Sequence, residues 1–311
     1  MSMEEHEYDV IVIGGGAAGL SGAVALLRSR RRVLVVDTGR PRNAPAAGVH
    51  NLLTRDGLPP SELVALGREE VRRYGGEVRQ GRAVAATRLG DGFEVHLESG
   101  DRATARRLLV TSGLVDELPE VDGLRERWGH QVLHCPYCHG WEVRDQRIGV
   151  LATGPAAVHQ ALLFSQLSAD VVVLAHTAPP AAEDRVRLAA AGVRVQEGEV
   201  VALEGPASAL LGARLADGAS VPLDAMVVAP RMLARSAVLD SLGLAPEPHP
   251  SGMGEQYPSG QGGRTDAPGV WVAGNVADIG AQVMAAAAAG TMAGAAMNMD
   301  LIESDLRERV A

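Results

Sequence analysis

The chain has 311 residues, of which 46% are hydrophobic and 3% aromatic, and its formal net charge at pH 7 is −9. This length suggests about two domains, and the negative charge argues against nucleic acid or an anionic membrane surface as partners. The acidic start lacks the basic region of a signal peptide, and the apolar stretch 283–297 is too short to cross a bilayer. We therefore expect a cytoplasmic protein with no membrane partner.

The first elements along the chain form a dinucleotide-binding pattern. Residues 9–13 predict a buried strand, and a glycine-rich turn follows at once. Residues 20–28 have the apolar spacing of a helix, and residues 32–36 predict a second strand that ends at Asp37. The order strand, glycine turn, helix, strand and acid is typical of the Rossmann unit.

The glycines of this turn and the acid have separate physical roles. Gly14 permits the tight turn, Gly16 lets the backbone approach a pyrophosphate, and Gly19 lets the helix pack on the strand. The free N–H groups of the helix N-terminus face the phosphates. Asp37 is placed to accept ribose hydroxyls, so we expect a nucleotide site at these residues.

The rest of the chain predicts an antiparallel meander, a second unit of the same kind and a closing helix. The expected strands are 93–98, 107–111, 147–151, 170–174 and 269–274, the expected helices are 156–167 and 282–301, and 246–263 is expected to be an irregular loop. The second unit repeats the order strand, turn, helix and strand. The predicted fold class is therefore α/β with two dinucleotide-binding units.

Both cysteines of the chain, Cys135 and Cys138, lie in one run, His-Cys-Pro-Tyr-Cys-His. A lone Cys-x-x-Cys in a chain that otherwise avoids cysteine is typical of a redox pair. The flanking His134 and His139 can take a thiol proton near neutral pH, which favours the thiolate that exchange needs. Half of a zinc site is the alternative, but zinc usually draws ligands from two separated segments and no second pair exists.

These motifs together resemble the low-molecular-weight thioredoxin reductase family over nearly the whole chain. The motifs are Gly14-x-Gly16-x-x-Gly19, Thr111-Ser-Gly113, Cys135-x-x-Cys138 and Gly269-Val-Trp-Val-Ala-Gly274-Asn275. The resemblance implies a homodimer with FAD as cofactor and two Rossmann-like domains, the second inserted in the first. It implies an FAD domain at 1–115 and 248–311, and an inserted NAD(P)-binding-like domain with the thiols at 116–247.

The resemblance also implies which residues contact the flavin cofactor. They are Gly14, Gly16 and Gly19 at the pyrophosphate, Asp37 at the adenosine ribose, Asn43, Asn51 and Gly113 around the flavin, Gly274 and Asn275 at the ribityl chain, and Gln282 and Val283 at the isoalloxazine carbonyl. Asn275 stands where the family has aspartate. Asparagine keeps an acceptor oxygen but lacks the charge, so we expect FAD still to bind.

The second nucleotide turn departs from the family in two places. Ala152 adds a methyl group where the backbone should approach the pyrophosphate, and Pro155 removes an N–H from the turn. Where the family has a His-Arg-Arg run for the 2′-phosphate of NADPH, residues 176–180 are His-Thr-Ala-Pro-Pro. No arginine is present in this run for bidentate phosphate contacts. We expect that this domain does not use NADPH efficiently.

A third departure is His139, which stands where reductases usually have aspartate. A histidine can act as a base toward an incoming thiol at neutral pH, whereas an ordinary aspartate is too weak a base. With the damaged second turn, this pattern resembles the thioredoxin-reductase-like dithiol oxidases of natural-product and antibiotic pathways, the holomycin and gliotoxin oxidases. The implied reaction closes a disulfide in a small-molecule dithiol, with O2 as acceptor and H2O2 as product.

In this mechanism the substrate thiolate attacks Cys135, His139 takes the proton, and the second substrate thiol displaces Cys135. The resemblance makes Cys138 the thiol next to the flavin. His134 is either a participant or a packing neighbour, and we expect no metal.

Two alternatives remain: a thioredoxin-disulfide reductase that uses NADPH or another donor, and a flavin-bound redox sensor or interaction module without enzymatic activity. The methionines of the last helix predict core or dimer packing.

Overall fold

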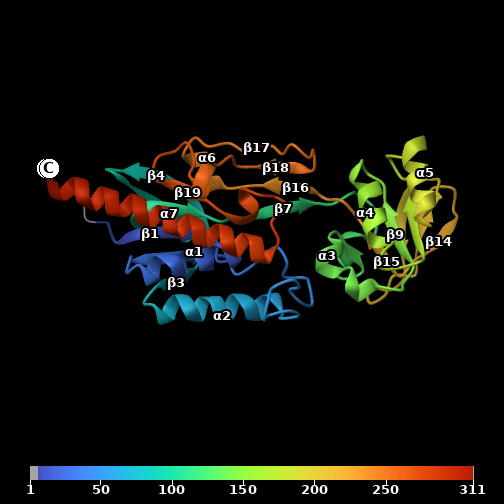
Figure 1. Ribbon diagram of the computed structural model, residues 1–311, viewed down its shortest axis with the longest axis horizontal. Coiled ribbons are helices and arrows are strands. Elements are labelled where there is room, and N and C mark those ends of the chain that lie inside the picture. The colour runs from blue at the N-terminus through green and yellow to red at the C-terminus, as the bar shows by residue number, and fades with distance from the viewer. Residues whose placement is uncertain (1–5, 311) are drawn as a thin grey trace. The chain divides into compact units, whose positions relative to one another are not determined.

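The computed structural model describes residues 6–310, and the chain divides into two compact units (Figure 1). Unit 1 contains the residues up to Ala44, Leu58–Val115 and the residues from Met232 on. Unit 2 contains Pro45–Gly57 and Asp116–Arg231. Two segments therefore differ from the expected domain boundaries, because residues 232–247 lie in unit 1 and residues 45–57 lie in unit 2.

Unit 1 is built on a seven-stranded sheet of order β3-β2-β1-β6-β5-β4, in which β19 also pairs with β6. The strands are β1 (Tyr8–Ile13), β2 (Val33–Asp37), β3 (Glu77–Gln80), β4 (Ala83–Leu89), β5 (Gly92–Leu97), β6 (Arg102–Val110) and β19 (Val270–Val272). β1, β2, β3, β6 and β19 pair in parallel, whereas β4, β5 and β6 form the expected antiparallel meander. The alternating residues of β1 enter two separate apolar cores, one on each face.

The described residues of unit 1 form four α-helices. They are α1 (Ala17–Arg28), α2 (Pro60–Arg73), α6 (Ala237–Ser241) and α7 (Val283–Val310). α7 crosses α1 at glycines: a Cβ on Gly290 would lie 1.9 Å from the Ala18 carbonyl oxygen, and a Cβ on Gly294 would lie 2.7 Å from that of Gly22. The two backbones can approach this closely only because side chains are absent at the crossing.

Two expectations for the C-terminal part of unit 1 were wrong. α7 continues to Val310 rather than ending at residue 301, because its last turns carry acids that pair with arginines of the sheet unit; Asp305 lies 2.7 Å from Arg106 and 2.8 Å from Arg31. The expected loop 246–263 contains two short strands. These strands join β7 (Leu114–Glu117) and β16 (Arg231–Ala234) in a four-stranded sheet, and they are β17 (Glu247–Pro248) and β18 (Gly254–Gln256).

Unit 2 contains a five-stranded parallel sheet of order β11-β10-β9-β15-β8 and a separate three-stranded antiparallel sheet. The elements are β8 (Val132–Leu133), α3 (Pro136–His139), β9 (Ile148–Leu151), α4 (Ala156–Phe164), β10 (Val171–Leu174), α5 (Ala182–Ala190), β11 (Arg194–Gln196), β12 (Val200–Glu204), β13 (Gly212–Leu215), β14 (Ser220–Pro222) and β15 (Ala225–Val227). The predicted second unit of strand, turn, helix and strand is therefore confirmed. Within residues 6–310, no helix has the length and hydropathy needed to cross a membrane.

Candidate functional site

The first glycine turn, between β1 and α1, has the geometry of a phosphate-binding turn. Gly14 has φ +103°, and a Cβ there would lie 2.4 Å from the Thr111 carbonyl oxygen. A Cβ on Gly19 would lie 1.9 Å from the Gly14 carbonyl oxygen, so only glycine fits at these two positions. By contrast, a Cβ on Gly16 would meet nothing within 4 Å, and no side chain caps α1. The first N–H groups of α1 are therefore open to a pyrophosphate.

Asp37, at the end of β2, holds this turn in place. Its carboxylate accepts hydrogen bonds from the N–H groups of Gly15 at 3.0 Å and Gly39 at 3.1 Å. Arg68 of α2 donates to the same carboxylate. A carboxylate has about four lone-pair sites, so these three contacts leave capacity for a ribose hydroxyl.

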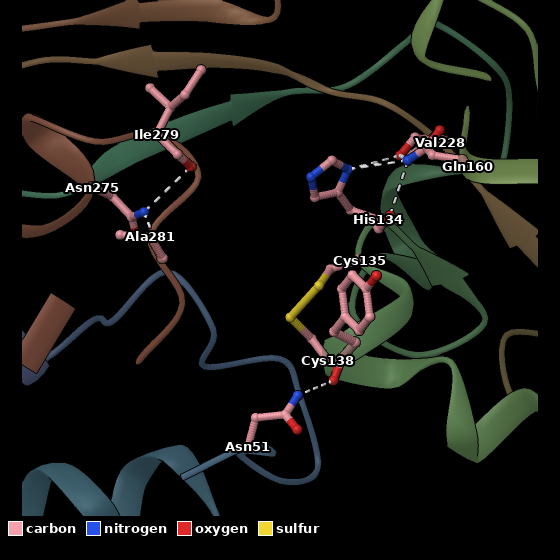
Figure 2. The surroundings of a disulfide bond; sticks show 10 residues. Asn51, His134, Cys135, Cys138, Gln160, Val228, Asn275, Ile279 and Ala281 are labelled. Atoms are coloured by element: carbon pink, nitrogen blue, oxygen red, sulfur yellow. Dashed lines mark hydrogen bonds between the residues drawn. A yellow bond between two sulfur atoms is a disulfide. The ribbon is translucent and has the colours of Figure 1, made fainter. Parts of the chain in front are cut away.

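Asn275 lies after β19, where Gly274 has φ +76°. Its Nδ2 donates to the carbonyl oxygens of Asp278 at 3.0 Å, Ala281 at 2.9 Å and Ile279 at 3.4 Å, as Figure 2 shows for the last two. This amide thus ties down the segment that leads into α7, which begins at Val283 directly after Gln282. Because Nδ2 makes these three hydrogen bonds, the side-chain oxygen Oδ1 is the atom of Asn275 that can accept a hydrogen bond from a ligand.

The other two flavin positions of unit 1 lie in loops next to these strands. Asn43 is half-buried in the turn after β2. Gly113 follows β6 with φ +72°, and a Cβ there would meet nothing within 4 Å. Thr111, two residues earlier, donates through Oγ1 to the Gly14 carbonyl at 2.7 Å. The Thr-Ser-Gly run therefore supports the glycine turn and leaves an open backbone position beside it.

The thiol pair lies in unit 2, at the single-turn helix α3. Cys135 precedes α3 and Cys138 lies within it, and the two residues form a disulfide with their Cα atoms 5.3 Å apart (Figure 2). The Cys135 carbonyl accepts the N–H groups of Cys138 and His139 at 3.3 and 3.2 Å. Both cysteines are half-buried, and Tyr137 between them is 62% exposed. The disulfide is thus within reach of a thiol from solvent.

His139 ends α3 directly after Cys138. Its Nε2 is buried and has no hydrogen-bond partner among the described residues. Burial lowers the pKa of His139 below its ordinary value of 6.5, and the charge of His50 lowers it further, while Glu142 acts in the opposite direction. The imidazole is therefore neutral at pH 7, which is the form that accepts a proton.

His134 lies on the other side of the pair, after β8. Its Nδ1 lies 3.2 Å from the Val228 carbonyl oxygen at the end of β15 (Figure 2). The side-chain amide of Gln160 donates to the His134 carbonyl at 3.0 Å and to the Val228 carbonyl at 3.3 Å. These bonds fix the histidine against the parallel sheet.

Asn51 lies with the thiol pair in unit 2. Its Nδ2 donates to the Tyr137 carbonyl in α3 at 2.6 Å, the contact that Figure 2 draws from Asn51 to α3. Next to it, His50 contacts Asp56 at 3.3 Å and Glu142 at 3.4 Å. The sequence analysis did not single out His50, Asp56 or Glu142, because only tertiary contact brings His50 and Asp56 to Glu142. The one local signal is that Glu142 lies three residues after His139.

The second nucleotide turn, between β9 and α4, is partly closed. Ala152 is fully buried, and its carbonyl accepts the N–H groups of Thr177 and Ala178 at 3.2 and 3.1 Å. Pro155 is the residue before α4 and has no N–H to offer. A Cβ on Gly154 would meet nothing within 4 Å, so one backbone position of the turn stays open.

Near the end of β10, where a 2′-phosphate would bind, the basic side chains of Arg185 and His176 already have partners among the described residues. Arg185 lies 2.7 Å from Glu197 and donates to the Pro180 carbonyl at 3.0 Å. His176 accepts the Val200 N–H at 3.1 Å through Nδ1, and burial lowers its pKa. Both basic side chains are thus committed to neighbours. Within the described residues, no group of three or more His, Cys, Asp or Glu side chains could hold a metal ion.

Comparison with known proteins gives the chain a family. Residues 8–293 match the family described as pyridine nucleotide-disulphide oxidoreductase. The solved structure of HlmI is 43% identical with a TM-score of 0.92, covering 99% of this chain and 97% of that one. The thioredoxin reductase sirT of Leptosphaeria maculans is 30% identical, covering 97% of each chain. A probable thioredoxin reductase of Arthroderma benhamiae is 34% identical over 58% of this chain and 46% of that protein.

Thioredoxin-reductase-like members of this family bind FAD, and the residues of unit 1 fit that cofactor. In this unit, phosphate contacts would come from the uncapped start of α1 and the open backbone at Gly16. Ribose and ribityl contacts would come from the acceptor oxygens of Asp37 and Asn275. The predicted resemblance, the fold and the cofactor are thereby confirmed. The chain belongs to the pyridine nucleotide-disulphide oxidoreductase family and has the thioredoxin-reductase-like fold of its flavoproteins.

Proposed function

We propose that this flavoprotein is a dithiol oxidase, which closes a disulfide in a small-molecule dithiol and uses O2 as the final acceptor, giving H2O2. The observation that carries the proposal is a combination within unit 2. A disulfide is followed by a half-buried histidine whose pKa is lowered by burial, and the second nucleotide turn has no arginine in residues 176–180. Such a unit can take electrons from a thiol more readily than from NADPH. The natural-product context rests on the resemblance to the holomycin and gliotoxin oxidases.

The residues of the pair have distinct parts in this reaction. A substrate thiol loses its proton to the imidazole of His139, and the thiolate attacks the Cys135 sulfur; a new sulfur–sulfur bond forms and Cys138 leaves as a thiolate. The second substrate thiolate then attacks the substrate sulfur of the mixed disulfide, the product disulfide closes, and Cys135 leaves. The substrate has lost two electrons, and the cysteine pair has gained them.

Bound FAD supplies a two-electron acceptor for the reduced pair and the chemistry that delivers electrons to O2. The residues proposed to hold it are those of unit 1 described above, from Gly14 to Val283. Asn51 is proposed to act at the thiol pair through the Tyr137 carbonyl rather than only at the cofactor. His134 is proposed to be a positioning residue, since Gln160 and Val228 hold it.

We propose further that the protein is a homodimer that pairs through α7. One face of this helix carries exposed apolar residues at alternating spacings of three and four, the pattern of a coiled-coil seam. They are Ala285, Ala288, Met292, Ala295, Met299, Ile302 and Leu306. The opposite face, with Met297 fully buried, packs on unit 1. A second copy of the same seam supplies the apolar partner that a long exposed stripe requires.

The compartment is also a proposal. The only two cysteines form one catalytic pair, which suits a compartment that keeps other thiols reduced, such as the cytoplasm.

The experiment that tests the function measures oxygen uptake by the FAD-loaded protein with dithiothreitol in air. We expect O2 consumption, H2O2 release and oxidised dithiothreitol in equal amounts, with loss of all three in Cys135→Ser. The contradicting result is little reaction with the dithiol together with rapid NADPH-dependent reduction of thioredoxin, which would support the reductase alternative.

A further inference from the structure

Aromatic side chains make up only 3% of the chain, yet two of the most exposed ones lie in the segment that carries the disulfide. Tyr137 is 62% exposed and Trp141 is 64% exposed. Among residues 6–310, the other aromatic residues are buried or half-buried, apart from Tyr74 in unit 1, which is 41% exposed. A single exposed aromatic residue needs no explanation, whereas two beside a reactive disulfide point to a ligand that they contact.

The backbone brings these two residues next to the thiol pair. The helical conformation of α3 continues through Gly140, which has φ −72° and ψ −31°, into the short 3₁₀ helix η2 (Trp141–Val143). The Gly140 N–H makes a helical hydrogen bond at 2.8 Å to the start of α3. Residues three and four apart along such a run are neighbours on its surface. Trp141 is therefore a surface neighbour of both Cys138 and Tyr137.

The ring of Trp141 is held from one side. The guanidinium carbon of Arg144 lies 4.3 Å from the centroid of the Trp141 ring, and Arg144 Nη1 donates to the Trp141 carbonyl at 2.8 Å. The guanidinium covers one face of the indole, and the exposure of Trp141 shows that the other face is open to solvent. The backbone of Tyr137 is held as well, because Asn51 Nδ2 donates to its carbonyl at 2.6 Å. Side chains that are already fixed lose little conformational freedom when a ligand binds.

We propose that Trp141 determines substrate specificity by stacking its open face on a planar ring of the dithiol; the inference rests on the dithiol oxidase function. The substrate class is a small dithiol whose two thiols are attached next to an aromatic or other flat unsaturated ring. Two stacked rings gain attraction beyond the apolar area that they bury. A ring stacked on Trp141 keeps the thiols of the same molecule beside the neighbouring disulfide, so exchange becomes more frequent. Arg144 is a positioning residue that acts through the indole.

The test compares two dithiols with the FAD-loaded protein under anaerobic conditions. They are ortho-benzenedimethanethiol, which has an aromatic ring, and dithiothreitol, which has none; both close a six-membered cyclic disulfide. Reduction of the protein disulfide is followed by acid quench, alkylation and intact mass at increasing dithiol concentration. The variants are Trp141→Ala and Trp141→Phe. The matched control is Tyr74→Ala, since Tyr74 is an exposed aromatic residue of unit 1 with an arginine, Arg28, 5.3 Å from its ring centroid.

We expect the parent to be half-saturated at a concentration of the aromatic dithiol about tenfold below that of dithiothreitol. Trp141→Ala should remove most of this preference, through the half-saturating concentration rather than the limiting rate, and Trp141→Phe should retain part of it because a ring remains. Tyr74→Ala should keep the preference of the parent.

The inference alone is overturned if the parent does not distinguish the two dithiols, or if Trp141→Ala prefers the aromatic dithiol as strongly as the parent does. It is also overturned if Trp141→Ala is slowed only with reduced thioredoxin, because the aromatic residues then bind a protein. A parent that reacts with neither small dithiol refutes the oxidase function, and this inference with it.

Discussion

Asn275→Asp restores the acidic residue that the resemblance places at the ribityl chain, yet we expect it to destabilise this protein. The Asn275 amide donates to two carbonyl oxygens at 2.9 and 3.0 Å and to a third at 3.4 Å. A carboxylate cannot donate any of these bonds and would face three carbonyl oxygens instead. The two shorter bonds alone, at about 0.5–1.5 kcal/mol each, predict a loss of about 1–3 kcal/mol in the free energy of unfolding.

The assay is urea unfolding of the FAD-free and FAD-loaded proteins, followed by circular dichroism and by release of flavin fluorescence. The apo-protein should lose the stability given above, and FAD should dissociate at lower urea from the variant. The matched control is Asn298→Asp, since Asn298 accepts from Arg31 Nε at 2.9 Å and a carboxylate accepts that bond equally well. If Asn275→Asp is as stable as Asn298→Asp, the amide does not anchor the segment before α7.

Three further predictions concern the thiols, the base and the dimer. Cys138→Ser should form a stable mixed disulfide at Cys135 when it is treated with the disulfide of a monothiol, which supplies the two-electron oxidant, as seen by intact mass; absence of this adduct would contradict the assigned attack. His139→Ala should slow dithiol oxidation by about 10²–10⁴-fold at pH 7, with partial recovery at higher pH. Since burial lowers the pKa of His139, the acidic limb of the parent's rate profile should lie below pH 6.5, and a limb above it would argue against this base. Met292→Glu should convert the dimer to a monomer, as measured by light scattering. A variant that remains a dimer would show that α7 is not the interface.

Local chemistry explains what could be predicted from the sequence. The glycine turn at Gly14 and Gly19 was predictable because close backbone approach excludes every side chain, and the strands around it have a clear apolar pattern. The pairing of Cys135 with Cys138 was predictable because both cysteines lie in one run. These signals depend on residues that are neighbours in the chain.

The parts that were missed depend on contacts between distant segments. The bond from Asn51 to Tyr137 spans 86 residues, and the contact of His50 with Glu142 is similarly remote, so no periodicity marks either. The length of α7 depends on Asp305 meeting two arginines, one of which lies in β6. The short strands within residues 246–263 exist because β16 pairs with β18, which composition rich in proline and glycine conceals.

The account's central claim is that electrons enter from a dithiol rather than from NADPH. The most direct measurement is an anaerobic titration of the FAD-loaded protein, in which flavin absorbance is followed after addition of dithiothreitol or, separately, NADPH. The account predicts rapid loss of flavin absorbance with the dithiol and slow or no loss with micromolar NADPH, because residues 176–180 contain no arginine and Arg185 is paired with Glu197. Rapid stoichiometric bleaching by micromolar NADPH would contradict the claim.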